Sequence, residues 1–240
     1  MTWLLYCVSN SGEFDGAQAV AGVGAQPVLF VDGFGLSAAV SIFDDSRASF
    51  DVNSMITYHK VVESLFERAT IIPFRYKTLL KNQEEIQNTF RDKHSHFKKL
   101  LSTLDGTIEL GIRLVKAKPV VDNKRSDNSL TKMFTGRNPG KAYLESRKAF
   151  YSTASWIEDQ KKEFCQFCSK QFDGLFVQLK SEAALLPEVQ NRKDLALISV
   201  YFLVRKNLSN EFRKKFQELK DLNLGKTLLS GPWPPYNFVV

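Results

Sequence analysis

Two cysteines, Cys165 and Cys168, form the most suggestive chemical pattern in the chain. A C-x-x-C pair can supply two of the four ligands of a structural zinc ion, or the two thiols of a redox site. No second C-x-x-C and no H-x-x-x-H is present to complete a zinc site. The pair also falls within a helical pattern beside Phe164 and Phe167, where cysteines act as small apolar residues. We therefore predict packed thiols and no metal.

Other fragments resemble catalytic motifs without meeting their requirements. The segment Gly136–Lys141 (GRNPGK) has too few residues between its glycines for a phosphate-binding loop, and Ala142 stands where that loop needs Ser or Thr. His94 and His96 would lie on different faces of a helix, so they share no ligand site. No motif places a Ser or Cys nucleophile beside His59, which we expect at the edge of the core with one backbone hydrogen bond. The sequence thus predicts a protein that is not an enzyme and needs no cofactor.

Charge is unevenly distributed along the 240 residues. The net charge is +7, yet residues 1–57 carry six acidic side chains and one Arg, a net charge of −5, which leaves +12 for the rest. Such a basic portion is typical of lysine-rich solvated helices, and it also suits an acidic partner such as nucleic acid. A basic nucleic-acid-binding or regulatory protein is therefore the alternative to a protein-binding role.

The composition also indicates a cellular compartment. Three cysteines cannot form a closed disulfide framework, which fits a reducing cytoplasm. The first residues lack the basic region of a signal peptide, and no apolar run is long enough to span a membrane. We expect a cytoplasmic protein without a membrane anchor.

The elements of the first half follow from hydrophobic periodicity. Alternation and turn residues predict strands at 3–8, 28–31, 36–43 and 71–74, and helical spacing predicts helices at 51–68 and 79–104. The first strand is apolar on both of its faces, as in a strand covered on both sides. Asp32 and Gly33 should form the hairpin turn, and Asp51 or Asn53 should cap the first helix. The predicted inward face of that helix holds Met55, Ile56, His59, Val62, Leu65 and Phe66.

A second unit begins near Thr107. Residues 107–117 alternate as a strand with Ile108, Leu110, Ile112 and Leu114 on one face, and residues 118–140 are polar, basic and aperiodic, as in a surface connection. The patterns then predict a long helix at 141–185, a central strand at 195–204, a helix at 208–222 and a strand at 227–229. The whole order favours an α+β protein with two small mixed units, residues 1–105 and 106–240.

Five stretches in this order resemble the GvpF/GvpL family of gas vesicle proteins. They are YHKVVESLF (Tyr58–Phe66), IIPFRYKT (Ile71–Thr78), IELGIRLV (Ile108–Val115), GKAYLESRK (Gly140–Lys148) and GPWPPYNF (Gly231–Phe238). The residues that match the family pattern are His59, Pro73, Arg75, Tyr76, Glu109, Gly140, Tyr143, Leu144, Gly231, Pro232, Trp233, Pro234, Pro235, Tyr236 and Phe238. The terminal stretch is the most specific of the five.

The resemblance implies a function and a fold. Family members look like two-domain α+β proteins whose later half is a modified ferredoxin-like fold. By resemblance, the chain would be a minor, non-enzymatic component needed for gas vesicle assembly, located at the vesicle in the cytoplasm. Its partners would be the hydrophobic shell protein and other accessory gas vesicle proteins, and neither nucleic acid nor a membrane is expected. The matching residues would have structural or interaction roles.

The terminal stretch GPWPPYNFVV raises a structural question because it is so apolar. Three prolines fix φ and remove backbone donors, so the stretch cannot form an interior strand. Trp233 and Tyr236 are expected to dock at a domain edge, so that the stretch folds back over the second unit. A free tail that inserts into a partner is the alternative.

Overall fold

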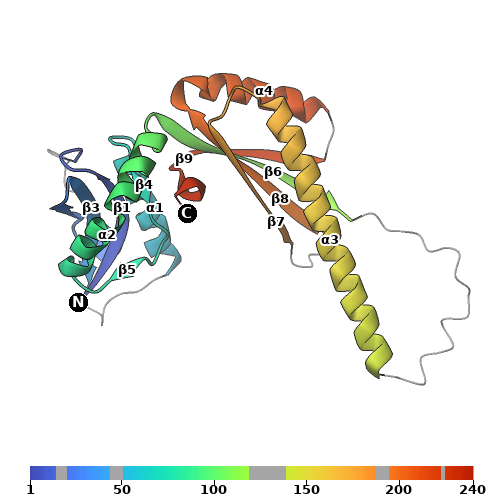
Figure 1. Cartoon of the computed structure of the whole chain (residues 1–240), viewed down its shortest axis with the longest axis horizontal. Coiled ribbons are helices and arrows are strands. Elements are labelled where there is room, and N and C mark those ends of the chain that lie inside the picture. The colour runs from blue at the N-terminus through green and yellow to red at the C-terminus, as the bar shows by residue number, and fades with distance from the viewer. Residues whose placement is uncertain (15–20, 44–50, 119–138, 187–194, 223–224, 240) are drawn as a thin grey trace, which may run out of the picture.

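The computed structural model describes residues 1–14, 21–43, 51–118, 139–186, 195–222 and 225–239 (Figure 1). Two antiparallel sheets and four α-helices make up these residues, so the predicted α+β class is confirmed. For residues 139–146, 148–150 and 221 the backbone alone is described. No described helix is long and apolar enough to cross a membrane.

The first sheet has five strands in the order β2-β3-β1-β4, with β5 also paired to β1. Its strands are β1 (Thr2–Asn10), β2 (Leu29–Gly33), β3 (Leu36–Phe43), β4 (Ile72–Pro73) and β5 (Leu79–Leu80). All pairings are antiparallel. A 3-10 turn, η1 (Val23–Ala25), lies in the connection before β2.

Two helices cover opposite faces of this sheet. In α1 (Val52–Phe66) the side chains of Tyr58 and Val62 share a buried cluster with Leu4 of β1. In α2 (Gln83–Leu104) the apolar side chains share another cluster with Leu5 of β1. Successive residues of a strand point to opposite faces, so this sandwich explains why β1 is apolar on both sides. The prediction of a strand covered on both faces is confirmed.

Three local predictions in the first half were wrong. One is the start of the second helix, since Leu79 and Leu80 form β5 and α2 begins at Gln83. The hairpin turn lies at Phe34-Gly35, because Gly33 still pairs with Leu36 and both turn residues have positive φ. The buried stripe of α1 is Tyr58, Val61, Val62 and Leu65, whereas Met55 and Ile56 are 40% and 46% exposed. That stripe follows the i, i+3, i+4, i+7 spacing of one helix face, rotated from the predicted face. Asp51 does cap α1, since its Oδ1 accepts from the backbone N–H of Ser54 at 2.8 Å.

The second sheet has four antiparallel strands in the order β7-β8-β6-β9. The strands are β6 (Thr107–Ala117), β7 (Gln178–Leu185), β8 (Leu195–Arg205) and β9 (Lys226–Trp233). The helices α3 (Pro139–Gln171) and α4 (Ser209–Asp221) pack on one face of this sheet, with a short η3 (Lys206–Leu208) before α4. The predicted inward residues of β6 are buried there together with Phe212, Phe216 and Leu219 of α4, and β8 is central, as predicted.

Strand β7 was missed, because residues 178–185 were predicted to continue the long helix. The helix ends at Gln171, and Gly174 follows with φ of +78°, a conformation that favours glycine. The segment QLKSEAAL is rich in helix formers, yet it pairs along its length with β8. Tertiary pairing has therefore overridden local propensity.

The second half has the order β-α-β-β-α-β, which is the order of a ferredoxin-like unit. The ferredoxin-like classification and the domain boundary at residue 105 stay predictions. The end of α2 at Leu104 and the start of β6 at Thr107 lie on either side of that boundary. Most of the predicted connection, residues 119–138, lies outside the described residues.

The C-terminal segment, residues 234–239, lies between the two sheets (Figure 1). Phe238 of the 3-10 turn η4 (Tyr236–Phe238) is buried in the cluster that holds Phe97 of α2 and Leu203 of β8. Tyr236 packs against the cluster of α1 and β1. The segment is docked and contacts the second unit, as predicted, through Asn237 and Phe238. It also packs on the first half, which was not predicted. We call this region the junction.

Candidate functional site

The family-motif residues come from five stretches of the sequence, and the structure brings many of them to the junction. The His59 ring of α1 lies edge-on to the Tyr236 ring, with centroids 5.8 Å apart, and Nδ1 lies 3.4 Å from the Tyr236 hydroxyl. Pro73, Arg75 and Tyr236 line one hollow beside α2. His59 is exposed and contacts a side chain, so its predicted backbone hydrogen bond was wrong.

Glu109 of β6 fastens the C-terminal segment to the second sheet. Its carboxylate accepts from the backbone N–H of Asn237 at 2.9 Å and from Asn237 Nδ2 at 2.6 Å. The residue is only 4% exposed, and burial raises the pKa of this carboxyl while the two bonds from Asn237 oppose that shift. A carboxylate with two donors on one residue fixes both the position and the orientation of η4.

Gly231, near the end of β9 and just before the C-terminal segment, is also fixed by close contacts. Gly231 has φ of +103°, and a Cβ there would lie 2.6 Å from the carbonyl oxygen of Glu109, so only glycine fits this bend. The carbonyl oxygen of Gly231 accepts from Arg213 Nη2 of α4 at 2.9 Å. Strand β9, helix α4 and the C-terminal segment are thus linked at one point.

Tyr58 ties the helix and strands of the first half together beneath the junction. It is completely buried, and its hydroxyl donates to the carbonyl oxygen of Phe74 at 2.8 Å, with the carbonyl oxygen of Leu5 at 3.0 Å. The Tyr76 ring lies 5.3 Å from the Tyr58 ring. Burial raises the pKa of Tyr58 and of Tyr236. Both phenols are therefore neutral at physiological pH, and each packs between neighbouring elements while its hydroxyl takes part in hydrogen bonding.

Other motif residues do not reach the junction, or meet it differently from expectation. Pro234 and Pro235 are buried, whereas Trp233, expected to be an anchor, is 44% exposed. Gly140, Tyr143 and Leu144 lie in the first turns of α3, at the end of that helix far from the junction in Figure 1. The positions of their side chains lie outside what the structure describes.

The cysteines lie in apolar surroundings. Cys7 and Cys168 are buried, and Cys165 is partly buried. Burial raises the pKa of Cys168 to about 12 and raises that of Cys7 as well. Since the thiolate is the reactive form, neither thiol is a nucleophile. Across the described residues, no three His, Cys, Asp or Glu side chains are grouped as metal ligands.

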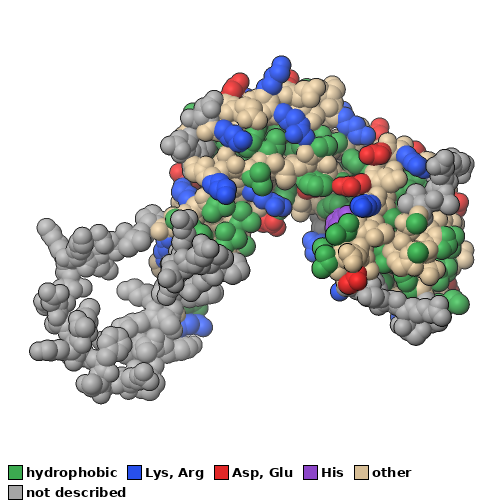
Figure 2. Space-filling model, turned by 180° about the vertical axis from the view of Figure 1, so that it is seen from behind, with side chains coloured by type: hydrophobic (Ala, Val, Ile, Leu, Met, Phe, Trp, Pro, Cys, Tyr) green, Lys and Arg blue, Asp and Glu red, His purple; other side chains and the backbone are tan. Residues whose placement is uncertain are grey.

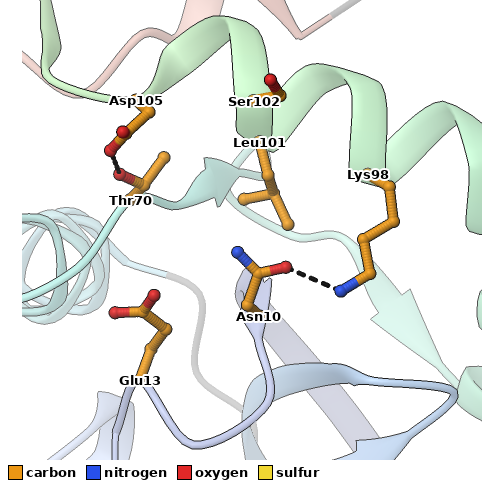
Figure 3. Close-up of a pocket in the computed structure, with 7 residues that line it drawn as sticks. All are labelled: Asn10, Glu13, Thr70, Lys98, Leu101, Ser102 and Asp105. Atoms are coloured by element: carbon orange, nitrogen blue, oxygen red, sulfur yellow. Dashed lines mark hydrogen bonds between the residues drawn. The ribbon is translucent and has the colours of Figure 1, made fainter.

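A polar hollow of about 330 Å³ is lined by residues of β1, of α2 and of the chain before β4, and none of the family-motif residues lines it (Figure 3). Lys98 Nζ donates to Asn10 Oδ1 and to the carbonyl oxygen of Gly35, both at 2.8 Å. Thr70 Oγ1 donates to Asp105 Oδ1 at 2.8 Å. These polar groups satisfy one another and tie α2 to the strands, which is a structural role.

Comparison with known proteins agrees with the resemblance seen in the sequence. Residues 2–240 match the family described as gas vesicle synthesis protein GvpL/GvpF. The chain belongs to the GvpL/GvpF family. The chain is therefore a gas vesicle protein, and the family prediction is confirmed. No curated protein sequence matches the chain.

Solved structures of gas vesicle proteins share the fold. The crystal structure of GvpF from Microcystis aeruginosa has a TM-score of 0.68 and 17% identity, covering 100% of this chain and 99% of that one. GvpF from Anabaena sp. PCC7120 has a TM-score of 0.67 and 13% identity, covering 100% and 98%. At such low identity these likenesses show the GvpL/GvpF fold and nothing finer.

Sequence reasoning missed three residues of the junction in this family member. Asn237 occupies the variable position of the terminal motif, and Tyr58 directly precedes the motif histidine. Arg213 lies on the basic side of α4, where a solvated role was the simplest interpretation. Only Tyr58 gave a usable signal, since it shares the i, i+3, i+4, i+7 stripe of α1.

Proposed function

We propose that this protein is an accessory factor required for gas vesicle assembly, that it is located at the vesicle, and that it contacts the apolar shell protein. Membership of the GvpL/GvpF family supports the vesicle role. The observation that carries the contact is the apolar edge strand β9, where Leu228 is 57% and Trp233 44% exposed.

A partner could contact β9 both along its outer edge and on the face of the sheet that the helices do not cover. It is the last strand of its sheet, so its outer backbone groups have no strand neighbour among the described residues. Leu228 pairs with Arg113 on the face of the sheet opposite the helices, since Leu229 and Leu114 point into the helix-covered core. Figure 2 shows hydrophobic side chains between Lys and Arg on the lobe that holds this sheet.

The physical chemistry of a gas-filled shell favours such a surface. A wall that keeps water out of a gas space must be strongly apolar, and its free subunits aggregate unless another protein covers them. An exposed edge strand with large apolar side chains can cover such a subunit by both backbone pairing and burial. The alternative of a nucleic-acid-binding protein gains nothing from the family match or from this surface.

The test is genetic complementation with two matched variants. A strain without this gene is expected to lack normal buoyant vesicles, and the wild-type gene is expected to restore them. Leu228→Glu should fail to restore them, because it places a charge on the proposed contact, while Leu222→Glu should restore them. Leu222 is 53% exposed beyond α4, so the two substitutions are alike in chemistry and exposure. Normal vesicles in the deletion strain would refute the assembly role, and full rescue by Leu228→Glu would refute the β9 contact.

A further inference from the structure

A second surface, beside the junction, combines an apolar floor with a basic rim. It is a hollow of about 370 Å³ between α2, the chain after β4 and the C-terminal segment. Apolar and basic residues of α2, of β4 and of the chain just after β4 line it, together with Tyr236 and Val239. We call it the junction groove.

The floor of the junction groove is preformed. Ile72, Pro73 and Phe97 are buried and held by the packing of the first half. Tyr236 and Val239 close one side, and both are held through the Glu109 contacts to Asn237. A rigid apolar floor binds a partner without an ordering cost of its own.

The rim of the groove carries basic side chains, and no acidic side chain of the lining neutralises them. Arg75, Lys93 and His96 line the groove and are exposed, and no Asp or Glu is among the lining residues. Within the part of the chain that the structure describes, the Arg75 guanidinium and the Lys93 ammonium make no hydrogen bond or ion pair. Cations that are not neutralised at the rim of a groove attract carboxylates and orient what binds.

We propose that the junction groove docks an acidic segment of another gas vesicle protein, in which carboxylates flank a large apolar side chain. The apolar side chain would enter the floor, and the carboxylates would meet Arg75 and Lys93, with Arg75 able to form a two-pronged pair. An apolar floor of this kind does not suit a nucleic-acid backbone, which is why a peptide is the occupant. The proposed function enters this inference only as the source of the partner.

The binding test uses overlapping synthetic peptides that together cover the shell protein and the other gas vesicle proteins of the same organism. Fluorescence anisotropy with the full chain should identify at least one peptide with carboxylates beside a large apolar residue. Its affinity should fall by at least about tenfold in three cases: when its Glu and Asp are changed to Gln and Asn, when the protein carries Arg75→Glu with Lys93→Glu, and between low and high salt.

A matched control carries the same charge change away from the groove. Arg68→Glu with Lys99→Glu alters two exposed cations that do not line it, and this variant should bind the peptide within about twofold of wild type. The proposal is overturned if no acidic peptide binds, if the groove variant binds as well as wild type, or if both variants weaken equally. If the peptides fail while Leu228→Glu still prevents vesicle formation, the groove inference alone is wrong.

Discussion

The contact between Glu109 and Asn237 holds the C-terminal segment on the second sheet, and its loss should be measurable. Asn237→Ala removes the 2.6 Å bond from Nδ2 and leaves the 2.9 Å bond from the backbone N–H. Glu109 is almost fully buried, so water does not readily replace the missing donor. Hydrogen bonds to charged groups contribute about 1.5–3 kcal/mol, and we expect the free energy of unfolding to fall by about that amount.

The assay is urea unfolding together with thermal unfolding. For a chain of this size, about 1 kcal/mol corresponds to roughly 2–4 °C in Tm, so Asn237→Ala should melt about 3–12 °C below wild type. Asn53→Ala is the matched control, because Asn53 is exposed on the first turn of α1 and surface changes usually stay within about 0.5 kcal/mol.

A double-mutant cycle with Glu109→Gln isolates the pair itself. The combined variant should lose less than the sum of the two single losses, with a coupling of about 1 kcal/mol or more. Additive losses would mean that the two residues act independently. If Asn237→Ala and Asn53→Ala unfold alike, the reasoning that this contact holds the junction together is refuted.

Three further outcomes are expected. Burial raises the pKa of Glu109 in the folded chain, so the folded state keeps the carboxyl proton to a higher pH than the unfolded state does. The free energy of unfolding of wild type, relative to that of Glu109→Gln, should therefore decline above about pH 4. A difference in urea unfolding that does not change with pH would contradict this. Trp233→Ala should cost about 1–2 kcal/mol, well below the roughly 3–5 kcal/mol of a buried aromatic, because the side chain is 44% exposed; a larger loss in thermal unfolding would show that the indole is buried in solution. A thiol reagent should label Cys165 in the folded protein but reach Cys7 and Cys168 only after unfolding, and mass spectrometry showing early labelling of either would refute their packing.

The sequence predicted the strands that have a one-sided or two-sided apolar pattern. Strands β1, β6 and β8 were found because each carries such a pattern and lies inside its sheet. Strand β7 was missed because it lies at an edge, is largely exposed and holds Ala183 and Ala184, which favour helices. Its strand conformation comes from pairing with β8, and local sequence carries no record of that partner.

Part of the candidate site was likewise predicted from the sequence, and part was not. The motif residues were named from a resemblance, and the structure shows that His59, Arg75, Glu109 and Tyr236 lie near one junction. The sequence could not predict which residues contact one another, since Glu109 and Asn237 are 128 residues apart. Trp233 and Tyr236 were both predicted to dock; Tyr236 packs in the junction together with Phe238, whereas Trp233 is 44% exposed.

The position of residues 236–238 in the sequence has a consequence for biosynthesis. A ribosome makes these residues after every strand and helix of both sheets. The 134 residues that follow Leu104, up to Phe238, require roughly 7–27 s at about 5–20 residues per second. During that interval the apolar surface that later receives Tyr236 and Phe238 lacks these two side chains. An early stop codon just before residue 236 would leave this surface permanently without Tyr236 and Phe238.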